Sequence, residues 1–230
     1  MTGLQANLVV MGACYLYIVL VIVVASYLKH GILSPKASRK FLHSMIGNLP
    51  LIMPYFTNSI FPFLVASPFI LVTFLVTPYS PFKWLSGKLS GLTDITEEGH
   101  HTGLVLYAIS YSALAFLYGN TPYIVAAGIF PMAYGDSTAA LIGMKYGRHK
   151  VGKKSLEGSV GMFLGSFFSL VFGMVYFASI YGFSASAQIL PVFLVSLVVT
   201  IVEFVSPSGF DNIAVPLLGA FTFMYTGGGV

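Results

Sequence analysis

Long apolar runs separated by short polar segments dominate the chain. The first run covers residues 8–28 and is followed by Lys29 and a polar segment that ends at Lys40. A membrane-spanning helix needs about 20 apolar residues, so this run is long enough to cross a bilayer. No basic residue precedes it, and it is longer than the apolar core of a signal peptide. It therefore predicts a retained membrane helix rather than a cleaved signal.

Seven further apolar runs follow the first, and each is interpreted as a span: residues 41–57, 60–76, 103–118, 122–143, 158–181, 188–205 and 213–226. The second run is short and contains Pro50 and Pro54, so it needs residues 38–40 as its first turn. Together with the third run it would also fit a re-entrant hairpin. The pattern predicts an all-α fold, a polytopic membrane helix bundle of about eight transmembrane helices, with seven as the alternative. Residues 1–230 contain no repeat or linker and are expected to form one domain.

Composition excludes most soluble classes of protein. Of the 230 residues, 57% are hydrophobic and only 8% are charged, with a mean hydropathy of +0.87. A soluble domain carries about 25% charged residues. A soluble enzyme, a disordered chain and a nucleic-acid module are therefore poor interpretations. The single cysteine, Cys14, can form neither an intramolecular disulfide nor a zinc cluster and is interpreted as a packing residue.

The charged residues lie on one side of the predicted topology. With eight spans, all 11 Lys and Arg residues fall in the segments 29–40, 78–102 and 144–157, whereas the opposite connections carry none. Cytoplasmic loops are enriched in Lys and Arg, so these segments are expected in the cytoplasm and both termini on the opposite side. The seven acidic residues also fall in these loops or in the adjoining helix halves. The net charge of +4 thus reports orientation, and no nucleic-acid partner is expected.

Asp136 is an ionisable residue inside an apolar run. It lies seven residues before Gly143, which is about 10 Å along a helix. A carboxylate at this depth is costly unless it faces a partner or a polar cavity, so function is the first interpretation. The alternative is an aspartate paired with a loop lysine only to hold helices together. Gly135, Ala139 and Gly143 share one helix face and would let a neighbouring helix approach closely.

The loop at residues 147–158 has the composition of a phosphate-binding segment. It nearly matches G-x-x-x-x-G-K-[ST], but Lys154 stands where Ser or Thr is required, and no strand is expected before it. A true phosphate loop of a nucleoside triphosphatase is therefore rejected. Glycines, lysines and a following helix start still favour binding of phosphate, and the alternative is contact with anionic lipid headgroups. Glu157 within this basic loop favours a role in metal binding or lysine positioning.

Further polar residues lie at the same depth near other helix ends. Glu203 lies within an apolar run, and Asp211 and Asn212 follow the turn after it. The latter two could also simply cap the last helix. His43 follows Arg39 and Lys40 by about one helical turn, so these three side chains can face one site.

Four of these motifs together resemble one family. Residues 39–43, 135–139, 154–158 and the set Glu203, Asp211 and Asn212 are similar in order and spacing to the polyprenol kinase family, over roughly residues 35–220. That family includes dolichol kinase, phytol kinase and the CTP-dependent diacylglycerol kinase. The resemblance implies an all-helical membrane enzyme that phosphorylates a lipid alcohol from a nucleotide, often CTP, with Mg²⁺.

The resulting hypothesis is a CTP-dependent kinase of an isoprenoid alcohol (phytol, geranylgeraniol, polyprenol or dolichol) or of diacylglycerol at the cytoplasmic membrane surface, with ATP or UTP as alternative donors. The alternatives are synthesis of a CDP-lipid, as in phosphatidate cytidylyltransferases, and a small membrane transporter that uses Asp136 and Glu203 as a relay. The candidate catalytic residues are Asp136, His43 and Glu203. The candidate phosphate-binding residues are Arg39, Lys40, Lys150, Gly152, Lys153, Lys154 and Ser155. The candidate Mg²⁺ ligands are Asp136, Glu157, Asp211 and Asn212.

Overall fold

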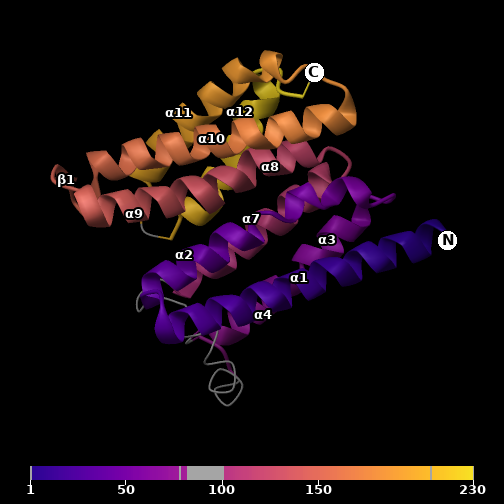
Figure 1. The fold of residues 1–230 in the computed structure, drawn as a ribbon, viewed down its shortest axis with the longest axis horizontal. Helices are drawn as coiled ribbons and strands as arrows, with labels where there is room; N and C mark the ends of the chain where they lie inside the picture. Colours follow the sequence, from indigo (N-terminus) through magenta and orange to yellow (C-terminus); the bar gives the residue numbers. More distant parts are fainter. Residues whose placement is uncertain (1, 78, 82–100, 208, 230) are drawn as a thin grey trace.

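The computed structural model describes residues 2–77, 79–81, 101–207 and 209–229, and helices make up most of these residues (Figure 1). The N-terminal part contains α1 (Gly3–Gly31), α2 (Pro35–Ile46), the 3₁₀ turns η1 (Leu49–Leu51) and η2 (Met53–Tyr55), α3 (Ile60–Ala66) and α4 (Pro68–Val76). The part after residue 100 contains α7 (His101–Tyr118), α8 (Pro122–Phe130), the π turn η3 (Pro131–Gly135), α9 (Asp136–Tyr146), strands β1 (Lys150–Val151) and β2 (Lys154–Ser155), α10 (Leu156–Tyr181), η4 (Ser186–Gln188), α11 (Ile189–Val205) and α12 (Asp211–Tyr225).

Several helices have the length and composition of membrane spans. Within the described residues, four are long and apolar enough to cross a bilayer: Gly3–Lys29, Pro122–Tyr146, Leu156–Tyr181 and Ser186–Val205. Two shorter apolar helical segments cover Ile60–Val76 and Thr102–Tyr118. Large apolar side chains such as Leu16, Phe168 and Phe172 are exposed on the outer surface. Such surfaces suit lipid, and the prediction of an all-α membrane helix bundle is confirmed.

The second predicted span was wrong in its extent. Residues 41–57 do not form one spanning helix, because α2 ends at Ile46 and the two short 3₁₀ turns follow it. Pro50 and Pro54 each stand in the first turn of one of these 3₁₀ elements, where a missing backbone N–H is tolerated but a long helix cannot continue. The helix also begins earlier than expected, at Pro35, with Ser34 as its N-cap.

The third predicted run is also divided. Ile60–Val76 consists of α3 and α4, which meet at Ser67 before Pro68. The loop at residues 78–102, with Lys83 and Lys88, falls largely outside the described residues, and so does the side chain of Arg39. The charge-based orientation therefore remains a prediction.

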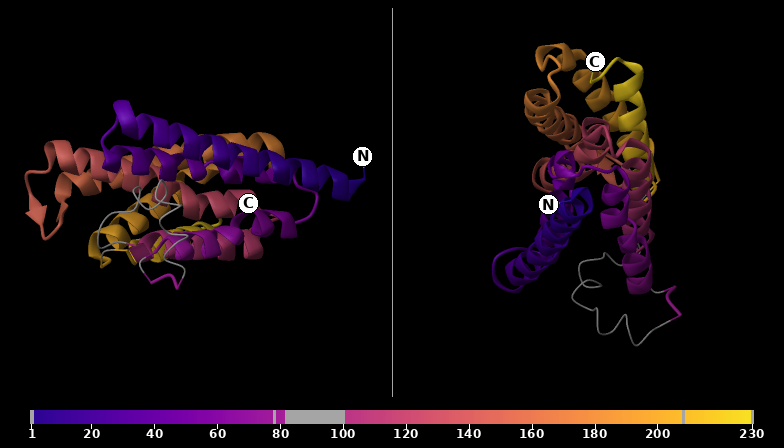
Figure 2. Two further views of the ribbon diagram at one scale, coloured as in Figure 1. Left: turned by 90° about the horizontal axis from the view of Figure 1, so that it is seen from below. Right: turned by 90° about the vertical axis from the view of Figure 1, so that its right-hand side faces the viewer.

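The centre of the molecule is the continuous helix formed by α8, η3 and α9. Figures 1 and 2 show α10, α11 and α12 on one side of it and α1 to α4 on the other. Nearly all of α8 is buried, including Phe130, which is 1% exposed. Buried apolar area is the main favourable contribution to packing within the protein interior.

Small residues bring α10 against this central helix, as the sequence predicted. A β-carbon added at Gly165 would lie 2.8 Å from the Tyr134 carbonyl oxygen, and one at Gly161 would lie 3.1 Å from that of Thr138. Real β-carbons do not approach backbone oxygens as closely as the first of these distances, so glycine permits this helix contact. The close contact fixes the start of α9, where Asp136 lies.

Candidate active site

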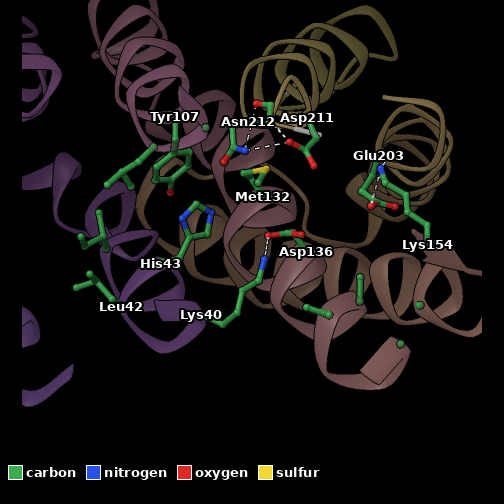
Figure 3. Close-up of a pocket in the computed structure, with 18 of the residues that line it drawn as sticks. Lys40, Leu42, His43, Tyr107, Met132, Asp136, Lys154, Glu203, Asp211 and Asn212 are labelled. Atoms are coloured by element: carbon green, nitrogen blue, oxygen red, sulfur yellow. Dashed lines mark hydrogen bonds and ion pairs between the residues drawn. The ribbon is translucent and has the colours of Figure 1, made fainter. Parts of the chain in front are cut away.

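A cavity of about 710 Å³ lies among α2, α7, α9, the β1–β2 hairpin and the start of α12 (Figure 3). Its volume is in the range of small-molecule sites. The charged and amide side chains in its wall come from α2, α9, the β1–β2 hairpin, α11 and α12: Lys40, Asp136, Lys150, Lys153, Lys154, Glu203, Asp211 and Asn212. Apolar side chains from α1, α3 and α4 line it as well: Ile18, Ala66 and Phe69. One wall is therefore charged and another is apolar.

Asp136 and Lys40 form an ion pair across the cavity. Lys40 Nζ contacts Asp136 Oδ2, and their side chains are only 13% and 16% exposed. Asp136 opens α9 directly after the π turn η3, an irregularity that is frequent at functional sites. The Ser44 hydroxyl donates to the Ala133 carbonyl oxygen at 2.9 Å and holds α2 against this turn. The partner of Asp136 is thus a lysine of α2, and two sequence-predicted site residues are brought together.

Lys154 and Glu203 form a second ion pair in the same cavity. Lys154 Nζ lies 2.9 Å from Glu203 Oε1. The ammonium also donates to the backbone carbonyl oxygens of Glu203 and Ser206 at the end of α11. Glu203 is 8% exposed. This arrangement fastens the β1–β2 hairpin, which carries Lys154, to the end of α11.

Asp211 and Asn212 lie at the start of α12, before its apolar part. Asp211 Oδ1 accepts hydrogen bonds from the backbone and side-chain nitrogens of Asn212, both at 2.9 Å. Burial raises the pKa of Asp211, the Asp136 carboxylate raises it further, and Lys154 and Lys40 oppose both effects. The carboxylates of Asp211 and Asp136 therefore interact electrostatically, as expected for groups that share one small cavity.

The hairpin supplies further basic residues. Lys150 and Lys153 line the cavity, and the turn between the strands contains Gly152 with φ of +62°, a conformation that favours glycine. The buried hydroxyl of Ser155 accepts a hydrogen bond from the backbone nitrogen of Gly158 at 3.1 Å. Ser155 therefore caps α10 in addition to lining the cavity.

Glu157 is not brought together with the other carboxylates. It does not line the cavity, because its side chain, in the first turn of α10, faces His149. Its carboxylate lies 2.7 Å from His149 Nδ1 and accepts a hydrogen bond from the His149 backbone nitrogen. Gly152 is likewise not part of the cavity wall.

His43 and two tyrosines connect the charged and apolar walls. The His43 ring packs on that of Tyr107, with centroids 4.2 Å apart. Tyr107 and Tyr111 also line the cavity, and sequence reasoning missed both as site residues. The available signal was two phenols four residues apart in an apolar helix, which is common in packed helices. Figure 3 shows His43 beside Tyr107 and Lys154 beside Glu203 on opposite sides of Asp136.

The donor set fits a divalent cation held jointly with a ligand. Among the described residues, no three His, Cys, Asp or Glu side chains cluster closely enough to hold a metal ion by themselves. Mg²⁺ at nucleotide sites is usually held by one or two carboxylates together with substrate phosphates. Asp136, Asp211 and Asn212 in a lysine-lined cavity match that requirement.

The fold and the cavity define an integral membrane protein with a charged site at its helix ends. Among curated proteins, the phytol kinase of Synechocystis sp. is 30% identical over 217 residues, which are 91% of this chain and 88% of that protein. A chloroplastic phytol kinase 1 of Arabidopsis thaliana is 29% identical over 227 residues, 92% of this chain and 72% of its own length. A chloroplastic farnesol kinase of the same plant is 29% identical over 213 residues, which are 84% of this chain and 66% of that protein.

These matches cover between 84% and 92% of this chain. The chain therefore belongs to the polyprenol kinase family, to which phytol kinase belongs. The resemblance inferred from the four motifs is confirmed. No protein-family model and no solved structure match the chain.

Proposed function

We propose that this protein is a kinase that transfers the γ-phosphoryl group of a nucleoside triphosphate, with CTP as the preferred donor, to the hydroxyl of an isoprenoid alcohol. The observation that carries the proposal is one cavity with two lysine–carboxylate pairs in one wall and apolar side chains in another. Such a site suits a phosphorylated donor and a lipid acceptor at once. The names of the relatives favour isoprenoid alcohols over diacylglycerol as acceptors.

The charged wall is the proposed binding site of the nucleotide phosphates. Lys40 and Lys154 each already contact a carboxylate, so in the resting protein their charge is balanced. When a triphosphate enters, the ammonium groups can turn to its oxygens. Lys150 and Lys153 add charge from the hairpin. Arg39 remains a candidate from the sequence alone. Neutralising phosphate charge is the main requirement of phosphoryl transfer.

The carboxylates are the proposed ligands of Mg²⁺. Asp136 and Asp211 would hold the ion, with the Asn212 amide oxygen as a neutral ligand, and Glu157 stays outside this set because its carboxylate faces His149. Held by these residues, Mg²⁺ would supply positive charge that offsets the negative charge developing during transfer. Glu203 keeps Lys154 in place through the ion pair described above.

The chemical step exchanges one phosphorus–oxygen bond for another. The oxygen of the alcohol bonds to the γ-phosphorus, and the bond from that phosphorus to the β–γ bridging oxygen breaks. The proton of the alcohol leaves to a nearby acceptor, for which Asp136 and His43 are the candidates because both line the cavity. The positions of the reactants contribute more to the rate of phosphoryl transfer than the basicity of this acceptor does.

The arrangement also suits a membrane-bound acceptor. Figure 1 places the β1–β2 hairpin at the end of the molecule away from the N-terminus. We place this end at the cytoplasmic membrane surface, because its loops carry the basic residues. The hydroxyl of the alcohol would then reach the phosphates while its chain remains in the bilayer.

The proposal is tested by an acceptor and donor panel. Purified protein in lipid nanodiscs is incubated with Mg²⁺, a γ-labelled triphosphate (CTP, UTP or ATP) and one acceptor (phytol, farnesol, geranylgeraniol, a long polyprenol or diacylglycerol). We expect label in the monophosphate of a phytol-like alcohol, fastest with CTP. Absence of a labelled lipid with every combination would contradict the proposal.

A further inference from the structure

Two tyrosines of α7 carry buried hydroxyls for which the described part of the chain offers no hydrogen-bond partner. Tyr107 and Tyr111 are each 5% exposed, and among the described residues neither hydroxyl has a hydrogen-bond partner. Both side chains line the cavity, and four-residue spacing places them on one helix face. A buried hydroxyl without a partner is unfavourable, so such groups in a cavity wall point to a ligand with a matching polar atom.

Tyr107 lies where the charged wall meets the apolar wall. On one side its ring packs on His43, which is three residues after Lys40 on α2, and Lys40 pairs with Asp136. On the other side it meets the edge of Tyr111, with ring centroids 6.0 Å apart and planes at 88°. Apolar residues of α1, α3, α4 and α7 also line the cavity, among them Ile18, Ala66, Phe69, Leu104 and Ala108. The Tyr107 ring therefore lies between the residues of the charged wall and those of the apolar wall.

We propose that Tyr107 binds the hydroxyl of the lipid alcohol, and that the isoprenoid chain lies past Tyr111 along the apolar wall formed by α1, α3 and α4. This inference rests on the proposed kinase function and names the residue that positions the acceptor. The phenol donates its hydrogen to one lone pair of the alcohol oxygen. A second lone pair stays available for attack on the γ-phosphorus, and no bond to Tyr107 forms or breaks.

The surroundings of Tyr107 favour a neutral hydroxyl over a phosphate. The ammonium of Lys154 lies on the opposite side of Asp136 from Tyr107 (Figure 3). The neighbours of Tyr107 on its own wall are aromatic or apolar, namely Tyr111, Leu104 and Ala108. A doubly charged group placed there would lose hydration without gaining a matching set of cations. An uncharged alcohol oxygen needs only one donor.

The test uses acceptor analogues that separate the oxygen from the chain. Phytol methyl ether can accept a hydrogen bond but cannot be phosphorylated, and the corresponding hydrocarbon has no oxygen at all. Both are measured as competitors of phytol phosphorylation in nanodiscs. We expect the ether to bind about three- to tenfold better than the hydrocarbon in the natural protein, as one neutral hydrogen bond provides.

The decisive variant is Tyr107→Phe, which keeps the ring and removes the hydroxyl. We expect the ether and the hydrocarbon to compete equally in it, and the KM for phytol to rise about three- to tenfold while the KM for CTP is unchanged. Tyr107→Met, which also lacks the hydroxyl, provides a second variant with the same expectation. Tyr176→Phe is the control, because its hydroxyl donates to the Leu51 carbonyl oxygen at 2.7 Å and does not line the cavity. It should keep the preference for the ether.

A variant at Tyr107 that keeps both the preference for the ether and the phytol KM would overturn the inference. If the natural protein phosphorylates no alcohol, the proposed function fails on its own, and equilibrium binding of the ether and the hydrocarbon without nucleotide replaces the kinase assay. In that assay, loss of the preference in Tyr107→Phe supports the role of Tyr107, and its retention overturns that role.

Discussion

Lys40 and Asp136, which are 96 residues apart in the sequence, form an ion pair between α2 and α9 inside the cavity. Each side chain is mostly buried, so each stabilises the other as a counter-charge. In the proposed reaction the Lys40 ammonium would bind phosphate and the Asp136 carboxylate would bind Mg²⁺. The pair therefore connects stability with catalysis and can be tested for both.

Replacing Asp136 by Asn should abolish most of the activity. The amide keeps the shape of the side chain but removes the charge proposed to face Mg²⁺, so kcat/KM should fall by roughly two to three orders of magnitude. Melting temperatures should fall as well, because Lys40 is left without its counter-charge. Adding Lys40→Met to Asp136→Asn should recover the melting temperature but not the activity. Activity of Asp136→Asn equal to that of the natural protein would exclude Asp136 as a metal ligand.

Replacing Lys154 by Met should affect the nucleotide more than the lipid. Loss of a charged hydrogen bond to phosphate should raise the KM for CTP by about tenfold or more, with little change in the KM for the alcohol. The matched control is Lys145→Met, because Lys145 is exposed, lies over the Tyr146 ring and does not line the cavity. Equal effects of the two variants on the KM for CTP would contradict a phosphate-binding role of Lys154.

The close contact between α10 and the central helix predicts that replacing a glycine by alanine destabilises the protein at this contact but not at an open position. A β-carbon at Gly165 would lie 2.7 Å from Thr138 Oγ1 and 2.8 Å from the Tyr134 carbonyl oxygen. Gly165→Ala should therefore lower stability by about 1–3 kcal/mol. At Gly12, where a β-carbon would meet nothing within 4 Å, the same change should be neutral or slightly stabilising. Thermal unfolding in detergent compares the two variants, and equal melting temperatures would contradict the packing described.

Residues 158–181 and 188–205 could be assigned from sequence because they are long, apolar and free of internal interruption. Residues 41–57 could not, since Pro50 and Pro54 allow a short helix followed by 3₁₀ turns as readily as a kinked span. The apolar pattern alone does not distinguish these outcomes.

The sequence predicted which residues form the candidate site better than it predicted which of them pair with one another. The spacing of Arg39, Lys40 and His43 indicated a shared face, but the pairing of Lys40 with Asp136 depends on how α2 returns alongside the central helix. Glu157 looked equivalent to the other carboxylates in sequence. The strand register that places Lys150 opposite Ser155 brings His149 close to Glu157 instead. Tyr107 was missed because a phenol in an apolar helix is ordinarily a packing residue.

The most direct test of the central claim is the position of the label that CTP transfers to the lipid. The protein in nanodiscs is given phytol and Mg²⁺ with CTP labelled at either the α- or the γ-phosphate. A kinase gives a lipid monophosphate that carries the γ label and never the α label. Transfer of the α label would instead indicate a cytidylyltransferase reaction and would contradict the account.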